Sequence, residues 1–170
     1  MKELHLVVLS VAVLLIAGNS YGQGYRVPSH YSFSDKESYH KYDKDIIRYA
    51  NWLEKIAPGD EEGNVKMGSR FFGEWLSGCS YVQYRQNFRV DGVLSDCPEY
   101  MKYYEAGYVR YALKNQGNPP SKVESSYAGL KMVLKVYAEN RGMKKYPGLD
   151  DLLKLEDDGK LKAWVQSRIE

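Results

Sequence analysis

The chain has 170 residues, of which 44% are hydrophobic and 27% are charged, and its formal net charge is +2. This length fits one ordinary domain, and the charge balance argues against nucleic acid or an anionic membrane as the partner. Tyrosine is the unusual component, with 16 residues against 4 phenylalanines, and its apolar ring and polar hydroxyl suit both a shallow core and a contact surface.

The N-terminus has the three parts of a secretory signal peptide. A charged start is followed by the apolar run 4–17 and then by a zone of small and polar residues. The apolar run is shorter than the roughly 20 residues that a membrane-spanning helix needs. Ser20 and Gly22 suit the positions before a cleavage site, so we expect cleavage before Gln23. Cleavage after Ala17 and an uncleaved anchor are the alternatives.

Removal of residues 1–22 as a signal peptide would leave no second apolar run long enough to span a membrane. Residues 23–33 are polar and aperiodic, and they predict a flexible lead-in. Residues 34–170 then form a single helical domain. Ser34 and Glu37 have the spacing of a capping box, which predicts that a helix begins there.

Apolar residues recur at helical spacing in four long stretches, each of which ends near Gly or Pro. Gly68 and Gly73 lie inside the second stretch, where such residues are typical of a close helix crossing. The pattern predicts an all-α, single-domain bundle of about four main helices plus short C-terminal helices. The long helices are expected at about 34–57, 65–76, 98–115 and 121–141, and the short ones at 149–155 and 161–169.

Residues 81–90 interrupt the helical pattern with a period of two, which predicts an extended segment lying across helices. Arg85 and Arg89 fall on its polar side, where they are candidates for contact with an acidic partner; simple solvation is the alternative. The apolar positions are Val82, Tyr84, Phe88 and Val90, and the polar ones are Gln83, Arg85, Asn87 and Arg89.

The third long helix carries a tyrosine stripe. A stripe at helical spacing usually faces the core, although it could instead present an aromatic surface to a glycan or a protein. Tyr103 lies off the stripe and is the better candidate for an exposed partner contact. The stripe consists of Tyr100, Tyr104, Tyr108 and Tyr111.

Four stretches of the chain resemble a family of small, secreted, all-α bacterial proteins that has no established activity. The resemblance implies the fold class and export, and it implies no mechanism. The stretches are WLEKIAP (52–58), FFGEWLSG (71–78), GLKMVLKVYAENRGMKK (129–145) and LLKLEDDGKLKAWV (152–165).

The two cysteines, Cys79 and Cys97, are expected to form a structural disulfide. Their spacing is neither that of a redox pair nor that of a zinc site, and export would place them in an oxidising compartment. A bond there would close a loop between two helix ends and contribute roughly 3 kcal/mol. Two free buried thiols and redox or intermolecular roles are the alternatives.

No metal site or cofactor is expected. Glu37 and His40 have the Glu-x-x-His spacing of di-iron bundles, but too few histidines remain to build the second motif. The acidic turn 157–159 does not fit a calcium loop, because Lys154 and Val165 would occupy its first and twelfth positions.

No catalytic residues are identified. The chain has no nucleophile-elbow or P-loop motif, and a cysteine nucleophile would need a histidine base close by. The sequence therefore favours a non-catalytic binding module in the cell envelope, secreted or periplasmic, whose partner is a protein or an envelope component. An immunity-like inhibitor is one version of this hypothesis by analogy. The alternative is a hydrolase that acts on an envelope polymer through carboxylates.

Overall fold

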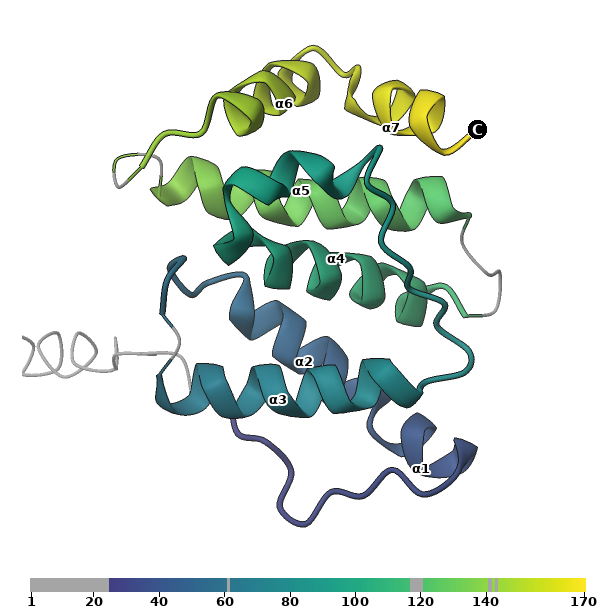
Figure 1. The fold of residues 1–170 in the computed structure, drawn as a ribbon. Helices are drawn as coiled ribbons and strands as arrows, with labels where there is room; N and C mark the ends of the chain where they lie inside the picture. Colours follow the sequence, from purple (N-terminus) through teal and green to yellow (C-terminus); the bar gives the residue numbers. More distant parts are fainter. Residues whose placement is uncertain (1–24, 61, 117–120, 141, 143) are drawn as a thin grey trace, which may run out of the picture.

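The computed structural model describes residues 25–60, 62–116, 121–140, 142 and 144–170. Within these ranges the chain is helical and contains no strand, which confirms the predicted all-α bundle. Figure 1 shows α6 and α7 packed on one side of the α4–α5 pair, with α2 and α3 on the other. The elements are α1 (Lys36–Lys41), α2 (Asp43–Leu53), α3 (Gly63–Gly78), η1 (Asp91–Asp96), η2 (Pro98–Tyr100), α4 (Met101–Lys114), α5 (Lys122–Asn140), α6 (Pro147–Asp157) and α7 (Leu161–Ile169).

The first predicted helix is two helices, α1 and α2, which meet at Tyr42. The capping box is real but lies one residue later than the sequence suggested. The side chain of Asp35 accepts a hydrogen bond from the Ser38 backbone, and the Ser38 hydroxyl accepts one from the Asp35 backbone. The reciprocal pair satisfies two free backbone amides at the start of α1.

The stretch before α1 forms no helix, as predicted, but its aromatic side chains pack into the core. Tyr25 is 6% exposed. The Tyr31 ring meets the Phe71 ring edge to face, with 4.8 Å between centroids, and Phe33 stacks on Tyr39. Aromatic packing of this kind ties the described part of the lead-in to α1 and α3.

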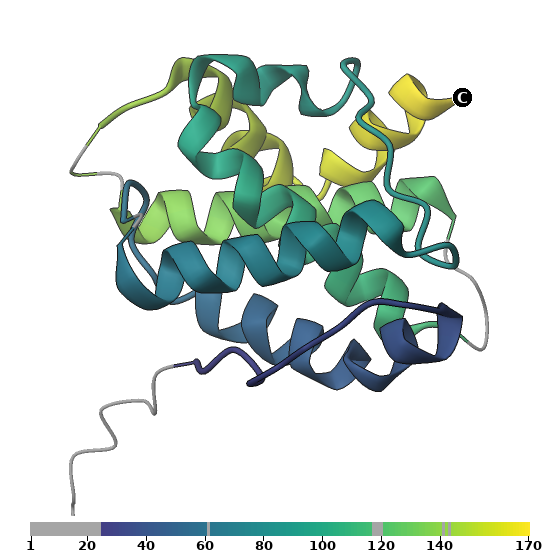
Figure 2. The same ribbon diagram turned by 60° about the horizontal axis from the view of Figure 1, so that its bottom comes forward.

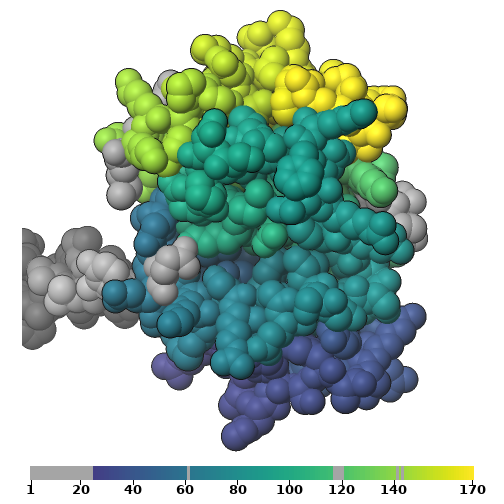
Figure 3. All heavy atoms as spheres, in the orientation of Figure 1, coloured from purple at the N-terminus to yellow at the C-terminus, as the bar shows by residue number. Residues whose placement is uncertain are grey.

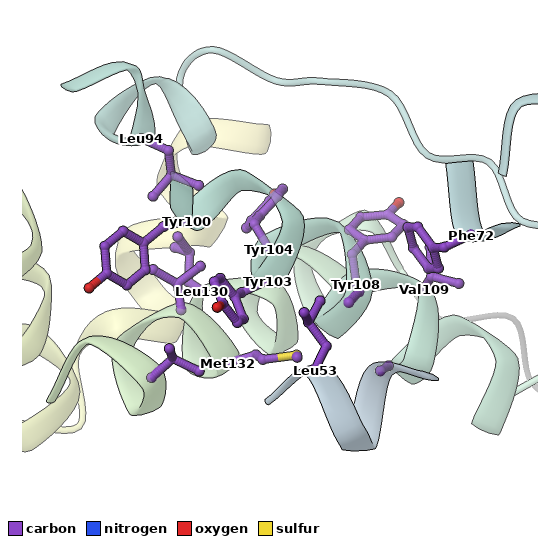
Figure 4. Packing of buried hydrophobic residues seen from close by; sticks show 14 of the residues in the cluster. Leu53, Phe72, Leu94, Tyr100, Tyr103, Tyr104, Tyr108, Val109, Leu130 and Met132 are labelled. Carbon is purple, nitrogen blue, oxygen red and sulfur yellow. The ribbon is translucent and has the colours of Figure 1, made fainter. Parts of the chain in front are cut away.

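Helix α4 is the central element, because it contacts α2 on one side and α5 on the other. Gly107 and Gly129 let α4 and α5 approach closely. A Cβ atom added to Gly107 would lie 2.9 Å from the Ala128 carbonyl oxygen, and one added to Gly129 would lie 2.8 Å from that of Tyr104. Figure 4 shows the residues that fill the surrounding core, Tyr103, Leu130 and Met132 among them.

The glycines of α3 differ from each other. A Cβ atom on Gly68 would lie 2.6 Å from the Tyr49 ring, which confirms a close approach of α3 to α2. Gly73 is exposed and has no atom within 4 Å of that position, so the same prediction is wrong for Gly73.

Residues 79–90, which we call the crossover, connect α3 to the 3-10 turns η1 and η2 that precede α4. In Figures 1 and 2, α3 and α4 both run from left to right. The crossover and η1 must therefore bring the chain back along the length of a helix. Among the described residues, no helix has both the length and the apolar character that crossing a membrane requires.

Candidate binding groove

Two adjoining hollows lie along the crossover. The first, of about 560 Å³, lies among α1, the start of the crossover, the end of α4 and the start of α5. The second, of about 450 Å³, follows the crossover toward the end of α7. Gln83, Tyr108 and Lys122 line both hollows, so we treat the two as one feature, the cationic groove. Figure 3 shows the crossover, in teal, on the molecular surface beside α7.

The groove is lined by four cations and by no carboxylate. Lys36 and Lys122 line the first hollow, and Arg85, Arg89 and Lys122 line the second. None of the four makes an ion pair with any described residue, whereas Arg110 and Lys135 elsewhere both pair with one glutamate. Unpaired cations gathered in one concave surface favour an anionic partner.

His40 lies at one end of the groove, where its ring packs against an aromatic side chain. Its ring stacks on Tyr81, with 3.8 Å between centroids and 14° between planes. The Asp43 carboxylate lies 3.1 Å from His40 Nδ1, and it accepts hydrogen bonds from the Tyr81 hydroxyl at 2.5 Å and from the Gln116 amide at 3.0 Å. Burial, with Asp43 beside the hydroxyl, raises the pKa of Tyr81 well above its usual value, so the phenol stays protonated.

An aspartate that orients a histidine is half of a general-base arrangement. The other half, a nucleophile hydrogen-bonded to the imidazole, is not found within the described residues, where the His40 ring hydrogen-bonds to Asp43 alone. The geometry holds the imidazole in place as a polar wall of the groove.

The structure places the two predicted arginine contacts, Arg85 and Arg89, together on the exposed side of the crossover. Val82 and Val90 are buried, as the period of two predicted, but Phe88 is 76% exposed and that part of the prediction is wrong. The cause is a turn at residues 88–90, where the Asn87 carbonyl accepts hydrogen bonds from Val90 and Asp91 and ends the alternation.

The third predicted contact, Tyr103, is fully buried, and its assignment as an exposed residue is wrong. Its hydroxyl donates to the Ile56 carbonyl at 2.9 Å, beyond the end of α2. Because α4 is covered on several sides, positions off its main stripe are also core. The stripe itself is buried at Tyr100, Tyr104 and Tyr108 and half-buried at Tyr111.

The predicted disulfide is not formed, since Cys79 and Cys97 are both free thiols. Cys79 caps the end of α3, and Cys97 joins η1 to η2 before α4. Figures 1 and 2 place these two helix ends on opposite sides of the molecule. A helix of 14 residues, such as α4, is about 21 Å long, whereas a disulfide requires Cα atoms within about 7 Å.

Neither thiol is prepared for nucleophilic chemistry. Burial raises the pKa of Cys79, and burial together with the neighbouring Glu99 and Asp96 raises the pKa of Cys97 to about 11. Both side chains are therefore protonated at neutral pH, and a thiol is a much weaker nucleophile than a thiolate.

A pair of carboxylates lies beneath the crossover, and it does not face the groove. Asp91 is 1% exposed, and one of its oxygens accepts a hydrogen bond from the Asn87 backbone at 2.9 Å. Burial and the charge of Asp91 raise the pKa of Glu105. Neither residue lines the two hollows. No group of three or more potential metal ligands occurs in the described part of the chain.

Lys36 and Lys122 were not among the residues predicted from the sequence. They lie in the first turns of two helices, far from the crossover in the chain, and nothing in their local sequence connects them to Arg85 or Arg89. Only the packing of α1 and α5 around the crossover brings the four cations together.

Comparisons with protein-family models, with curated proteins and with solved structures give no significant match to this chain.

Proposed function

We propose that the protein is a non-catalytic binding module of the cell envelope, and that it holds an anionic partner in the cationic groove. The observation that carries this proposal is the set of four unpaired cations, with no carboxylate, in two adjoining hollows. In this proposal the chain is exported and residues 1–22 are removed; those residues lie outside the described part of the structure.

The groove is better suited to binding than to hydrolysis of a polymer. Glycoside hydrolysis needs two carboxylates on either side of the scissile bond, and a substrate in this groove would meet none. An inhibitor that captures a toxin is one form of the proposed binding function. It needs only a complementary surface and no catalytic centre.

The test compares capture by three forms of the mature protein, each immobilised and exposed to a cell-envelope fraction. The first is the wild type, and the second is Arg85→Glu/Arg89→Glu/Lys122→Glu. The third is the matched control, Lys55→Glu/Lys66→Glu/Lys145→Glu, which reverses three exposed charges away from the groove.

We expect the wild type and the control to retain the same envelope component and the groove variant to lose it. Equal retention by the groove variant would contradict the proposal. So would release of soluble fragments from envelope polymer by the wild type, because that result would establish a hydrolase.

A further inference from the structure

The crossover is attached to the core at both ends of its exposed stretch. Val82 and Val90 are buried. The Tyr108 hydroxyl donates to the Gln83 carbonyl at 3.1 Å, and Asp91 accepts from the Asn87 backbone. A segment that is already ordered loses little conformational entropy when a partner binds, so it is a pre-organised surface.

Between these two attachments the backbone is open. The N–H and C=O groups of Arg85 and Gln86 make no hydrogen bond to any described residue. Residues 84–86 belong to no helix or turn, and Figure 1 shows the crossover drawn out along the molecule. Backbone groups left open in an extended segment can pair with a second extended chain, as at the edge of a sheet.

The side chains around these unpaired backbone groups are positively charged, so they favour a partner segment that is negatively charged. Arg85 and Arg89 are exposed, and Lys122 reaches the same hollow from α5. The exposed Phe88 ring lies between the two arginines in sequence and offers an apolar contact. Arginine pairs with carboxylates through two parallel hydrogen bonds, which fixes position as well as charge.

From this arrangement we infer that the partner is a protein with an extended acidic segment, which lies along residues 83–89. Its backbone pairs with Arg85 or Gln86, because neighbouring residues of an extended segment direct their N–H and C=O groups to opposite edges. Its carboxylates meet Arg85, Arg89 and Lys122, and an apolar side chain rests on Phe88. This inference rests on the proposed binding function and adds the class of partner. A polypeptide supplies the alternating amide donors and acceptors that fit the open backbone, and an anionic glycan does not.

The first step of the test is selection of a random ten-residue peptide library, displayed on phage, on the immobilised mature protein. Selection on Arg85→Glu/Arg89→Glu and on the exposed-charge control Lys55→Glu/Lys66→Glu runs in parallel. We expect the wild type and the control to enrich peptides with acidic residues two positions apart, a spacing that an extended chain presents on one face and a helix does not. The arginine variant should not enrich them.

The second step uses the most enriched peptide, made synthetically and measured by fluorescence anisotropy. Arg85→Glu/Arg89→Glu should weaken binding by at least about tenfold. N-methylation of alternate peptide nitrogens keeps every charge but removes the donors of one edge. Two such peptides are possible, one methylated at the odd positions and one at the even positions, and we call them the two methylated registers. We expect one of them to bind about tenfold more weakly than the unmethylated peptide, because it loses the backbone pairing.

Three outcomes of the peptide experiments would overturn the inference. They are no enrichment of acidic peptides, enrichment at helical spacings only, and unchanged affinity for both methylated registers. Binding of polygalacturonate in place of the peptides would overturn the inference while leaving the proposed function standing. If the groove variant and the wild type captured the same component from the envelope fraction equally well, the proposed function itself would be contradicted.

Discussion

Helix α5 and the crossover both lie against α4, but they pack on it in different ways. At the α4–α5 interface the backbones meet at Gly107 and Gly129, with no room for a further methyl group. The crossover instead rests on α4 through rings, with 5.3 Å between the centroids of Tyr84 and Tyr108. It also leaves the Tyr84 hydroxyl buried with no hydrogen-bond partner in the described part of the chain.

This difference separates stability from function in the molecule. Close packing between α4 and α5 contributes to the stability of the fold and exposes little. The crossover packs less closely on α4, but it exposes two arginines and backbone groups that make no hydrogen bond to a described residue. Substitutions in the first region should therefore change the free energy of unfolding, and substitutions on the outer side of the second should change binding.

Gly129→Ala tests the packed region and should have the largest effect. The new methyl group would lie 2.8 Å from a Tyr104 backbone oxygen, so one of the two helices must shift. We expect a loss of about 1–3 kcal/mol in the free energy of unfolding, measured by urea titration. Gly73→Ala is the matched control, because no atom lies within 4 Å of its added Cβ atom. This substitution should raise the free energy of unfolding by about 0.5–1 kcal/mol. Similar gains for both substitutions would contradict the comparison.

Arg110→Met should have the next largest effect, because Arg110 on α4 hydrogen-bonds to Glu54 at the end of α2 at 3.0 and 3.2 Å. Loss of these bonds should cost about 1–2 kcal/mol at pH 7. Burial alone would raise the pKa of Glu54, but Arg110 and Lys135 hold it below its usual value.

A lowered carboxylate pKa stabilises the fold at pH values above the unfolded-state pKa of about 4.3, and this contribution is lost as pH falls through the folded-state pKa. The difference between wild type and Arg110→Met should therefore shrink in acid, as measured by urea titration at a series of pH values. The exposed pair of Arg70 and Glu74 is the control, and Arg70→Met should produce no comparable change.

Glu105→Gln should have a smaller effect of opposite sign. Burial and the charge of Asp91 raise the pKa of Glu105, so its ionised form destabilises the fold at neutral pH. We expect the variant to melt at a higher temperature than the wild type at pH 7. The gain should fade as pH falls through the raised folded-state pKa, and it should be lost below the unfolded-state pKa of about 4.3, where the carboxyl is protonated in both states. The exposed control Glu139→Gln should show no such dependence on pH.

Phe88→Ser should have the smallest effect on stability. The ring is 76% exposed, so the free energy of unfolding should stay within about 0.5 kcal/mol of the wild type. Affinity for an acidic peptide selected on the groove should nevertheless fall, because the apolar contact is removed. A stability loss as large as that of Val90→Ser, at a fully buried position of the same segment, would show that Phe88 belongs to the core.

Local patterns in the sequence predicted the helices well. Capping signals, apolar stripes and the prolines and glycines between them depend on neighbouring residues, and the helices lie close to where those signals placed them. The alternation at Val82 to Arg85 also predicted the inward and outward sides of the crossover.

The directions of the helices could not be predicted in this way. Two helices joined by a long connection can point the same way or opposite ways, and the local sequence does not decide between them. The structure has α3 and α4 pointing the same way, which separates Cys79 from Cys97 and removes the expected disulfide. The burial of Tyr103 and the meeting of Lys36 and Lys122 likewise depend on which elements become neighbours in space.

The direction of α4 also has a consequence for the order of folding. Helices α4 and α5 pair as two regular helices joined by a short connection, whereas the crossover has no helix of its own and packs on the surface that α4 provides. We expect φ-values to be high for substitutions between α4 and α5 and near zero at Val82 and Val90. The cationic groove would then be completed at the end of folding, so a partially folded chain would present no binding surface.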